Sequence, residues 1–212
     1  MKYFLVVFFL LICEFIFAQT TTTCECEPTT KFENQERSSA KHETYYANYK
    51  RKKDTVDVKF IYSWEKLYAD STKNISKNPQ NSKSYRKHKT PEDTLYIVKA
   101  YMWFVKKEGN DCDFHIEIGP KRSNGTRVII EVTRENIDLQ KKIKAHLNTL
   151  ELKIMGCGTG DSKKAHFKKG IPIVVIGLGF YDVSHKPNTN HGDKHTKKYS
   201  WELHPVKDII FL

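Results

Sequence analysis

The pattern of apolar and polar residues divides the chain into three parts, and the last part carries the clearest structural signals. Residues 1–18 are a nearly continuous apolar run, residues 19–92 are mostly polar, and residues 93–212 contain repeated apolar segments. Within the last part, the segments 94–107, 112–118 and 126–132 are rich in β-branched and aromatic residues, which predicts three consecutive strands. Two further segments of this kind, at 170–183 and 199–212, predict a fourth and a fifth strand.

Between the third and fourth predicted strands, the spacing of the apolar residues changes from two to three or four. This spacing predicts a helix with one apolar face, closed by Gly156, and its apolar residues are Leu139, Ile143, Leu147, Leu150 and Ile154. Asn124-Gly125 predicts a tight hairpin turn before the third strand. Three strands, a helix and two strands follow one another in OB-fold barrels, so we predict a mainly β, OB-fold-like five-stranded barrel over residues 93–212. A small α+β sheet with a single helix is the alternative.

The first 92 residues predict an export signal followed by a basic, polar segment. Lys2 and the apolar run up to residue 18 are typical of a cleavable signal peptide, so we expect an exported protein, periplasmic or extracellular. In residues 19–92, only the stretch near 55–68 is apolar enough to predict a short ordered element, and its pattern fits a strand or a helix. No later segment has the roughly 20 apolar residues of a membrane-spanning helix.

Positive charge is concentrated in the polar segment. The chain carries a net charge of +11, and residues 31–90 hold 15 Lys or Arg against 7 Asp or Glu, whereas residues 91–212 hold 20 against 15. Such a balance favours an anionic partner such as nucleic acid or a polysaccharide. The alternative is a generally basic exported protein with no specific anionic partner.

Four cysteines follow the predicted signal peptide, at Cys24, Cys26, Cys112 and Cys157. Export permits disulfides, and four cysteines allow three different pairings. Because Cys24 and Cys26 are too close in sequence to pair easily, a bridge from Cys112 to Cys157 is the preferred pairing, although the others stay open.

Acidic residues and histidines alternate with apolar residues in the second and fifth predicted strands. Phe114, Ile116 and Ile118 predict the core face of the second strand, which places the residues between them on the opposite face. In an OB-fold the third strand lies between the second and the fifth, so we expect polar residues of all three strands and of two loops to converge. The candidate site residues are Glu108, Asp111, Asp113, His115, Glu131, Asp182, His185, Glu202 and His204.

Three interpretations of these residues are open. They can be structural, with acids and histidines that satisfy backbone N–H groups or pair with Lys and Arg. They can form a divalent metal site, because carboxylates and imidazoles suit zinc or manganese and a cation relieves repulsion among acids. The predicted metal ligands are Asp113, His115, Glu202 and His204. They can also recognise a ligand without a metal.

The segments EGNDCDFHIEI, VVIGLGFYDVSH and WELHPV resemble motifs of a family of uncharacterised bacterial proteins, many of them exported. The motifs of that family are close to E-x-x-D-x-D-F/Y-H, G-x-G-F-x-D-x-x-H and E-L-H-P-V. The resemblance covers residues 90–212 and implies that the candidate residues form one shared site. Because that family has no established activity, the resemblance does not identify the chemistry of the site.

From these patterns we expect an exported, soluble binding module rather than an enzyme. Its ligand stays open, and a polyanion such as nucleic acid, bound through the OB-like face, is one candidate. The alternative is a metal-dependent hydrolase of the phosphodiesterase type, in which Asp182 or His185 serves as the base. A small, basic, exported domain is equally compatible with an inhibitor-type protein that binds another protein.

Overall fold

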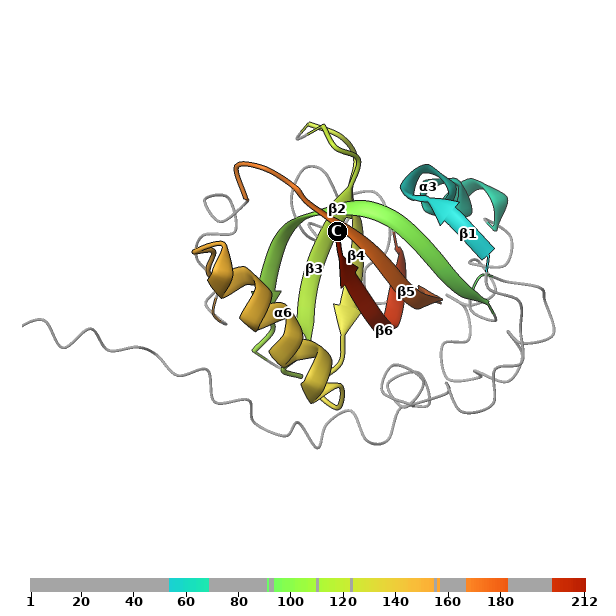
Figure 1. The fold of residues 1–212 in the computed structure, drawn as a ribbon. Coiled ribbons are helices and arrows are strands. Elements are labelled where there is room, and N and C mark those ends of the chain that lie inside the picture. The colour runs from blue at the N-terminus through green and yellow to red at the C-terminus, as the bar shows by residue number, and fades with distance from the viewer. Residues whose placement is uncertain are drawn as a thin grey trace, which may run out of the picture.

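The computed structural model describes residues 54–68, 91, 94–109, 111–122, 124–154, 156, 167–182 and 200–212. In this part of the chain the protein is mainly β, with two helices, a closed five-stranded barrel and one extra strand (Figure 1). The barrel strands are β2 (Leu95–Lys107), β3 (Phe114–Gly119), β4 (Val128–Val132), β5 (Ile171–Tyr181) and β6 (Trp201–Phe211). Each of them lies within one of the five predicted segments or extends it by one residue.

The barrel has the strand order expected of an OB-fold. Neighbouring strands follow the order β2-β3-β4-β6-β5, and β5 pairs with β2 to close the barrel. Strand β4 is parallel to β6, whereas the other four barrel pairs are antiparallel. Helix α6 (Ile137–Thr149) connects β4 to β5. The predicted OB-like fold and its order of three strands, a helix and two strands are therefore confirmed.

Strand β2 closes the barrel because it is long enough to pair on both of its edges. Its first part, from Leu95 to Met102, pairs with β5, and its second part, from Tyr101 to Lys107, pairs with β3. The register with β3 shifts between Met102 and Phe104, and such a bulge bends a strand. Figure 1 shows β2 curving across the barrel from β1 and α3 toward the side where α6 lies.

The short element predicted near residues 55–68 contains both of the structures that its pattern allowed. Strand β1 (Asp54–Asp57) pairs in parallel with β2, and helix α3 (Val58–Leu67) follows at once. The Asp57 carboxylate accepts a hydrogen bond of 2.9 Å from the N–H of Phe60 and so caps the helix. Trp64 is completely buried, and its ring lies 4.8 Å from that of Tyr96 and 5.6 Å from that of Trp201. Helix α3 is thus part of the hydrophobic core.

Helix α6 ends earlier than its apolar pattern predicted. The prediction extended it to Ile154 and used Gly156 as the stop, but the helix ends at Thr149. Glu151 adopts a left-handed φ of 56°, its N–H bonds to the carbonyl of Asn148, and the N–H of Leu152 bonds to that of Leu147. These are the two hydrogen bonds of a Schellman motif, in which glycine usually takes the left-handed position. A glutamate in that position gave no stop signal in the sequence.

The predicted tight hairpin at Asn124-Gly125 is wrong in its length. Strands β3 and β4 do form an antiparallel pair, but residues 120–127 separate them, and the ladder ends at Ile118 and Val128. The glycine instead closes a turn in which its N–H bonds to the carbonyl of Arg122. The carbonyl of Thr126 in this loop accepts a hydrogen bond from the Tyr62 hydroxyl, which connects the loop to α3.

Several predictions fall outside the described residues, namely the signal peptide, most of the basic segment, Cys24, Cys26, Cys157 and His185. Cys112 is disulfide-bonded, and its pairing with Cys157 stays a prediction because the partner lies outside the described residues. Neither of the two helices in the described part of the chain is long and apolar enough to cross a membrane.

The integration of α3 into the core can be tested with two aromatic residues on the same helix. We expect Trp64→Ala to lower the free energy of unfolding by about 3–5 kcal/mol, because it leaves a large cavity at a completely buried position. Phe60 is 40% exposed and serves as the matched control, for which we expect a loss below about 1 kcal/mol. Urea unfolding followed by circular dichroism measures both, and equal losses would contradict this placement of α3.

Candidate metal centre

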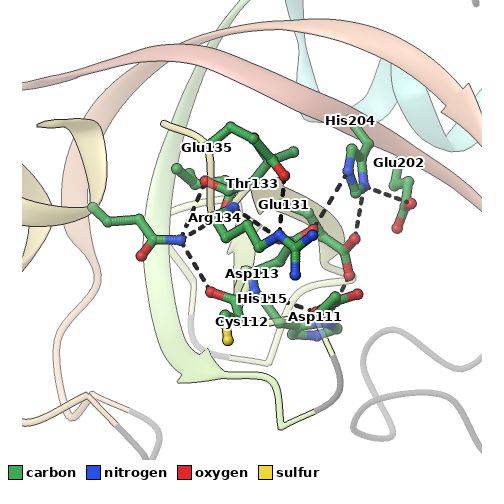
Figure 2. A network of polar contacts seen from close by, with 12 residues as sticks. Asp111, Cys112, Asp113, His115, Glu131, Thr133, Arg134, Glu135, Glu202 and His204 are labelled. Carbon is green, nitrogen blue, oxygen red and sulfur yellow. Dashed lines mark hydrogen bonds and ion pairs between the residues drawn. The ribbon is translucent and has the colours of Figure 1, made fainter. Parts of the chain in front are cut away.

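Three neighbouring strands of the barrel bring the candidate residues together. His115 on β3 lies directly opposite Glu131 on β4, and Ile130 on β4 is aligned with Leu203 on β6. Because side chains alternate along a strand, the residues next to this aligned pair, Glu131 and His204, share the opposite face of the sheet. Figure 2 shows Glu202 and His204 reaching toward Glu131 from one side, with Asp113 and His115 on the other.

Glu131 occupies the centre of this cluster. Its Oε2 atom lies 2.6 Å from Nδ1 of His204, and its Oε1 atom lies 3.6 Å from Nδ1 of His115. One carboxylate therefore stands between two imidazoles from different strands. Glu131 can do so because β4 is the middle strand of the three.

Asp113 completes the group from the residue just before β3. Its Oδ1 atom accepts a hydrogen bond of 2.9 Å from the N–H of Arg134, and its Oδ2 atom lies 3.7 Å from Nε2 of His204. Its own N–H donates to Oδ1 of Asp111 at 3.2 Å. Asp111 thus stabilises the conformation of the loop that carries Asp113.

Asp113, Glu131 and His204 can hold a metal ion. Each offers one ligand atom, the three atoms lie within 4.8 Å of one another, and all three residues are buried. An ion about 2.1 Å from each ligand holds two ligand atoms at most about 4.2 Å apart, so small side-chain movements suffice. The group shares Asp113 and His204 with the predicted ligands, but it contains Glu131 in place of His115 and Glu202. Glu131 is among the candidate site residues but not among the predicted metal ligands, and the middle strand β4 places its carboxylate at the centre of the group.

Glu202 and Asp182 add negative charge beside this group. Oε1 of Glu202 lies 3.4 Å from Nδ1 of His204. Burial and the charge of Glu131 raise the pKa of Glu202 from 4.5 to about 7, Asp182 acts in the same direction, and His204 partly opposes them. Asp182 is itself buried at the end of β5, where its N–H bonds to the carbonyl of Ser200 at 2.8 Å.

His115 lies at the opposite edge of the cluster, beside Glu108. Nδ1 of His115 is 3.8 Å from Oε1 of Glu108, whose other oxygen lies 3.0 Å from Nζ of Lys106. Burial alone lowers the pKa of His115, but the hydrogen bond to Glu131 and the charges of the surrounding glutamates outweigh burial and raise it above 6.5. The imidazolium form of His115 is therefore favoured by its acidic neighbours.

Glu117 lies on the same face but has a different function in the fold. It forms a buried ion pair of 2.8 Å with Arg127, and the guanidinium of Arg127 lies 5.2 Å from the ring centre of Trp103. The pair is a structural ion pair next to the candidate metal centre.

The polar face is buried, although the alternation of the strands predicted only that it lies opposite the apolar core. Exposure is 5% or less for His115, Glu131, Glu202 and His204, and Asp113 is completely buried. The ring of Phe180 also packs against that of His204, with their centres 5.4 Å apart. The side chains of this cluster can therefore contact a ligand of the size of an ion, whereas a polymer cannot reach them in this conformation.

The raised pKa of Glu202 predicts how the stability of the metal-free protein depends on pH. Between pH 4.5 and about 7 the folded carboxyl keeps a proton that the unfolded chain releases, so the free energy of unfolding falls as the pH rises. Because glutamine does not titrate, we expect the free energy of unfolding of Glu202→Gln, relative to that of the wild type, to rise by about 2–3 kcal/mol between pH 4.5 and pH 8. Urea unfolding in the presence of a chelator measures this difference, and the exposed Glu135→Gln is the control. A difference that does not change with pH would contradict the prediction.

No protein-family model matches the chain, and no curated protein or solved structure is significantly similar to it.

Proposed function

We propose that this domain binds one divalent transition-metal ion through Asp113, Glu131 and His204. The observation that supports this proposal most directly is the convergence of three buried ligand atoms within 4.8 Å. Two carboxylates and an imidazole from three different chain segments form a ligand set that is common for zinc and manganese.

The charges of the cluster also support a cation. Asp113, Glu131, Asp182 and Glu202 can carry four negative charges, whereas the two imidazoles of His115 and His204 can carry at most two positive ones. Burying charge in a protein interior costs several kcal/mol per group after relaxation. Protons can reduce that cost, as the pKa of Glu202 shows, and a divalent ion at the centre would reduce it more strongly.

Metal binding can be measured by calorimetric titration of the chelator-treated, dialysed protein with Zn²⁺ and with Mn²⁺. We expect one ion per chain and tighter binding of Zn²⁺ than of Mn²⁺, because affinity rises along this series for a given set of ligands. Asp113→Asn, Glu131→Gln and His204→Ala should each weaken binding by more than about 100-fold, since each removes one of three ligands and even supporting residues contribute 10–100-fold.

Matched substitutions outside the group separate a loss of ligands from a general loss of structure. His146→Ala removes a half-buried histidine that stacks on Phe211, and Asp208→Asn removes an aspartate paired with Lys142. Both variants should bind the ion as the wild type does. If the wild type binds neither ion, or if these controls lose binding as strongly as the ligand variants, the proposal is wrong.

Metal-assisted hydrolysis is the second candidate function, and it requires the buried cluster to open far enough to admit a substrate. Catalytic zinc sites typically have three protein ligands and leave a fourth position for water, which is the number of ligands in this group. Glu202, whose Oε1 lies 3.4 Å from Nδ1 of His204, can serve as a base, and Asp182, whose charge acts on Glu202, is a further candidate. If the zinc-loaded wild type hydrolyses a phosphodiester and His204→Ala does not, this function is supported. If the wild type does not hydrolyse it, the domain binds a metal without this activity.

Binding of an anionic polymer is a separate proposal and rests on the net charge of +11. Most of the segment that carries the excess charge lies outside the described residues, and the buried cluster is not the surface that such a polymer would contact. If single-stranded nucleic acid is bound, the logarithm of the affinity should fall with the logarithm of the salt concentration by about 0.7 per phosphate contacted.

A further inference from the structure

The side chain of Gln140 lies where it can set the spacing between two of the proposed ligands. Its Nε2 atom is 3.1 Å from the carbonyl oxygen of Cys112, 3.1 Å from that of Val132 and 3.2 Å from that of Thr133. Three carbonyl acceptors require a donor, so this atom is the amide nitrogen rather than the amide oxygen. Its two hydrogens are shared among the three carbonyls.

These carbonyls belong to the residues next to the proposed ligands. Cys112 directly precedes Asp113, and Val132 directly follows Glu131. The ladder between β3 and β4 ends at the pair Phe114 and Val132. Beyond this pair, strand pairing does not hold the two segments together. The Gln140 amide supplies that connection at the point where the metal ligands are.

A second contact joins the same two segments. The N–H of Arg134, which follows Thr133, donates to Oδ1 of Asp113 at 2.9 Å. Figure 2 shows Thr133 and Arg134 beside Cys112 and Asp113, with this contact drawn between them. Because Cys112 has a left-handed φ of 67°, which is unfavourable for a residue other than glycine, the loop needs such contacts to keep its shape.

Helix α6 fixes the position of the Gln140 backbone. Leu139, Ile143 and Leu147 of this helix are buried in the core, and the Asn136 side chain caps its first turn by accepting a hydrogen bond from Leu139. The amide of Asn136 also lies 3.4 Å from the carbonyl oxygen of Val206 on β6, the strand that carries His204. The first turns of α6 thus contact the segments that carry all three proposed ligands.

We propose that Gln140 is a positioning residue for the metal centre, which holds the backbone segments that carry Asp113 and Glu131 close to each other. This inference rests on the proposed metal-binding function. It assigns to α6 a role in metal affinity that is distinct from its role in the hydrophobic core.

The test compares metal affinity with stability in variants of α6, all as the full-length chain. Gln140→Leu keeps the size of the side chain but removes the donor, and we expect it to weaken binding of Zn²⁺ and Mn²⁺ by about 10–100-fold. Leu147→Ala is the matched control, because it removes core packing of the same helix but none of the hydrogen bonds to Cys112, Val132 and Thr133. We expect it to lower stability while the affinity of the folded protein stays that of the wild type. If Gln140→Leu does not fold by circular dichroism, Gln140→Ala replaces it.

The outcomes distinguish this inference from the proposed function. If the wild type binds the ion and Asp113→Asn does not, but Gln140→Leu binds like the wild type, the role of Gln140 is wrong and the metal centre stands. If Leu147→Ala weakens binding as much as Gln140→Leu, the effect is one of helix stability, and the positioning role is again wrong. If the wild type binds neither ion, the metal centre and the role of Gln140 fail together.

Discussion

The burial of several carboxylates beside two histidines is the constraint around which this barrel is built. Glu131 stands between His115 and His204, and Asp113 and Glu202 lie next to the same imidazole of His204. Such groups repel one another and lose hydration when buried, which costs several kcal/mol per ion. Protonation relieves part of this cost, as the pKa of Glu202 near 7 shows, and the proposed metal ion would relieve more.

The scaffold keeps these groups together by fixing the strands on which they lie. The pairing of β2 with β5 closes the barrel, and the position of β4 between β3 and β6 brings the three polar faces side by side. At one end of the same face, Arg127 neutralises Glu117 at 2.8 Å. At the other end, the acids face imidazoles and the N–H of Arg134, an arrangement that suits a site for a cation better than a static ion pair.

Much of the fold and the membership of the site could be read from the sequence. Segments rich in β-branched and aromatic residues identified the five strands, the change of period identified α6, and the resulting order matched an OB-fold. That order also indicated that His115, Glu131, Glu202 and His204 share one face. The end of α6 could not be predicted, because Glu151 adopts the left-handed conformation that glycine usually takes at the end of a helix. The contacts of Gln140 could not be predicted either, because they are made to backbone carbonyls, which every residue carries.

The sequence by itself determined which residues face away from the apolar core, since the alternation of side chains along a strand is a local property of the backbone. Only the tertiary structure decided that this face is buried, that Glu131 rather than His115 belongs to the three-residue group, and that Cys112 and Val132 meet at one amide. These features depend on distances between strands and on what packs over them, and such distances are set when the barrel closes.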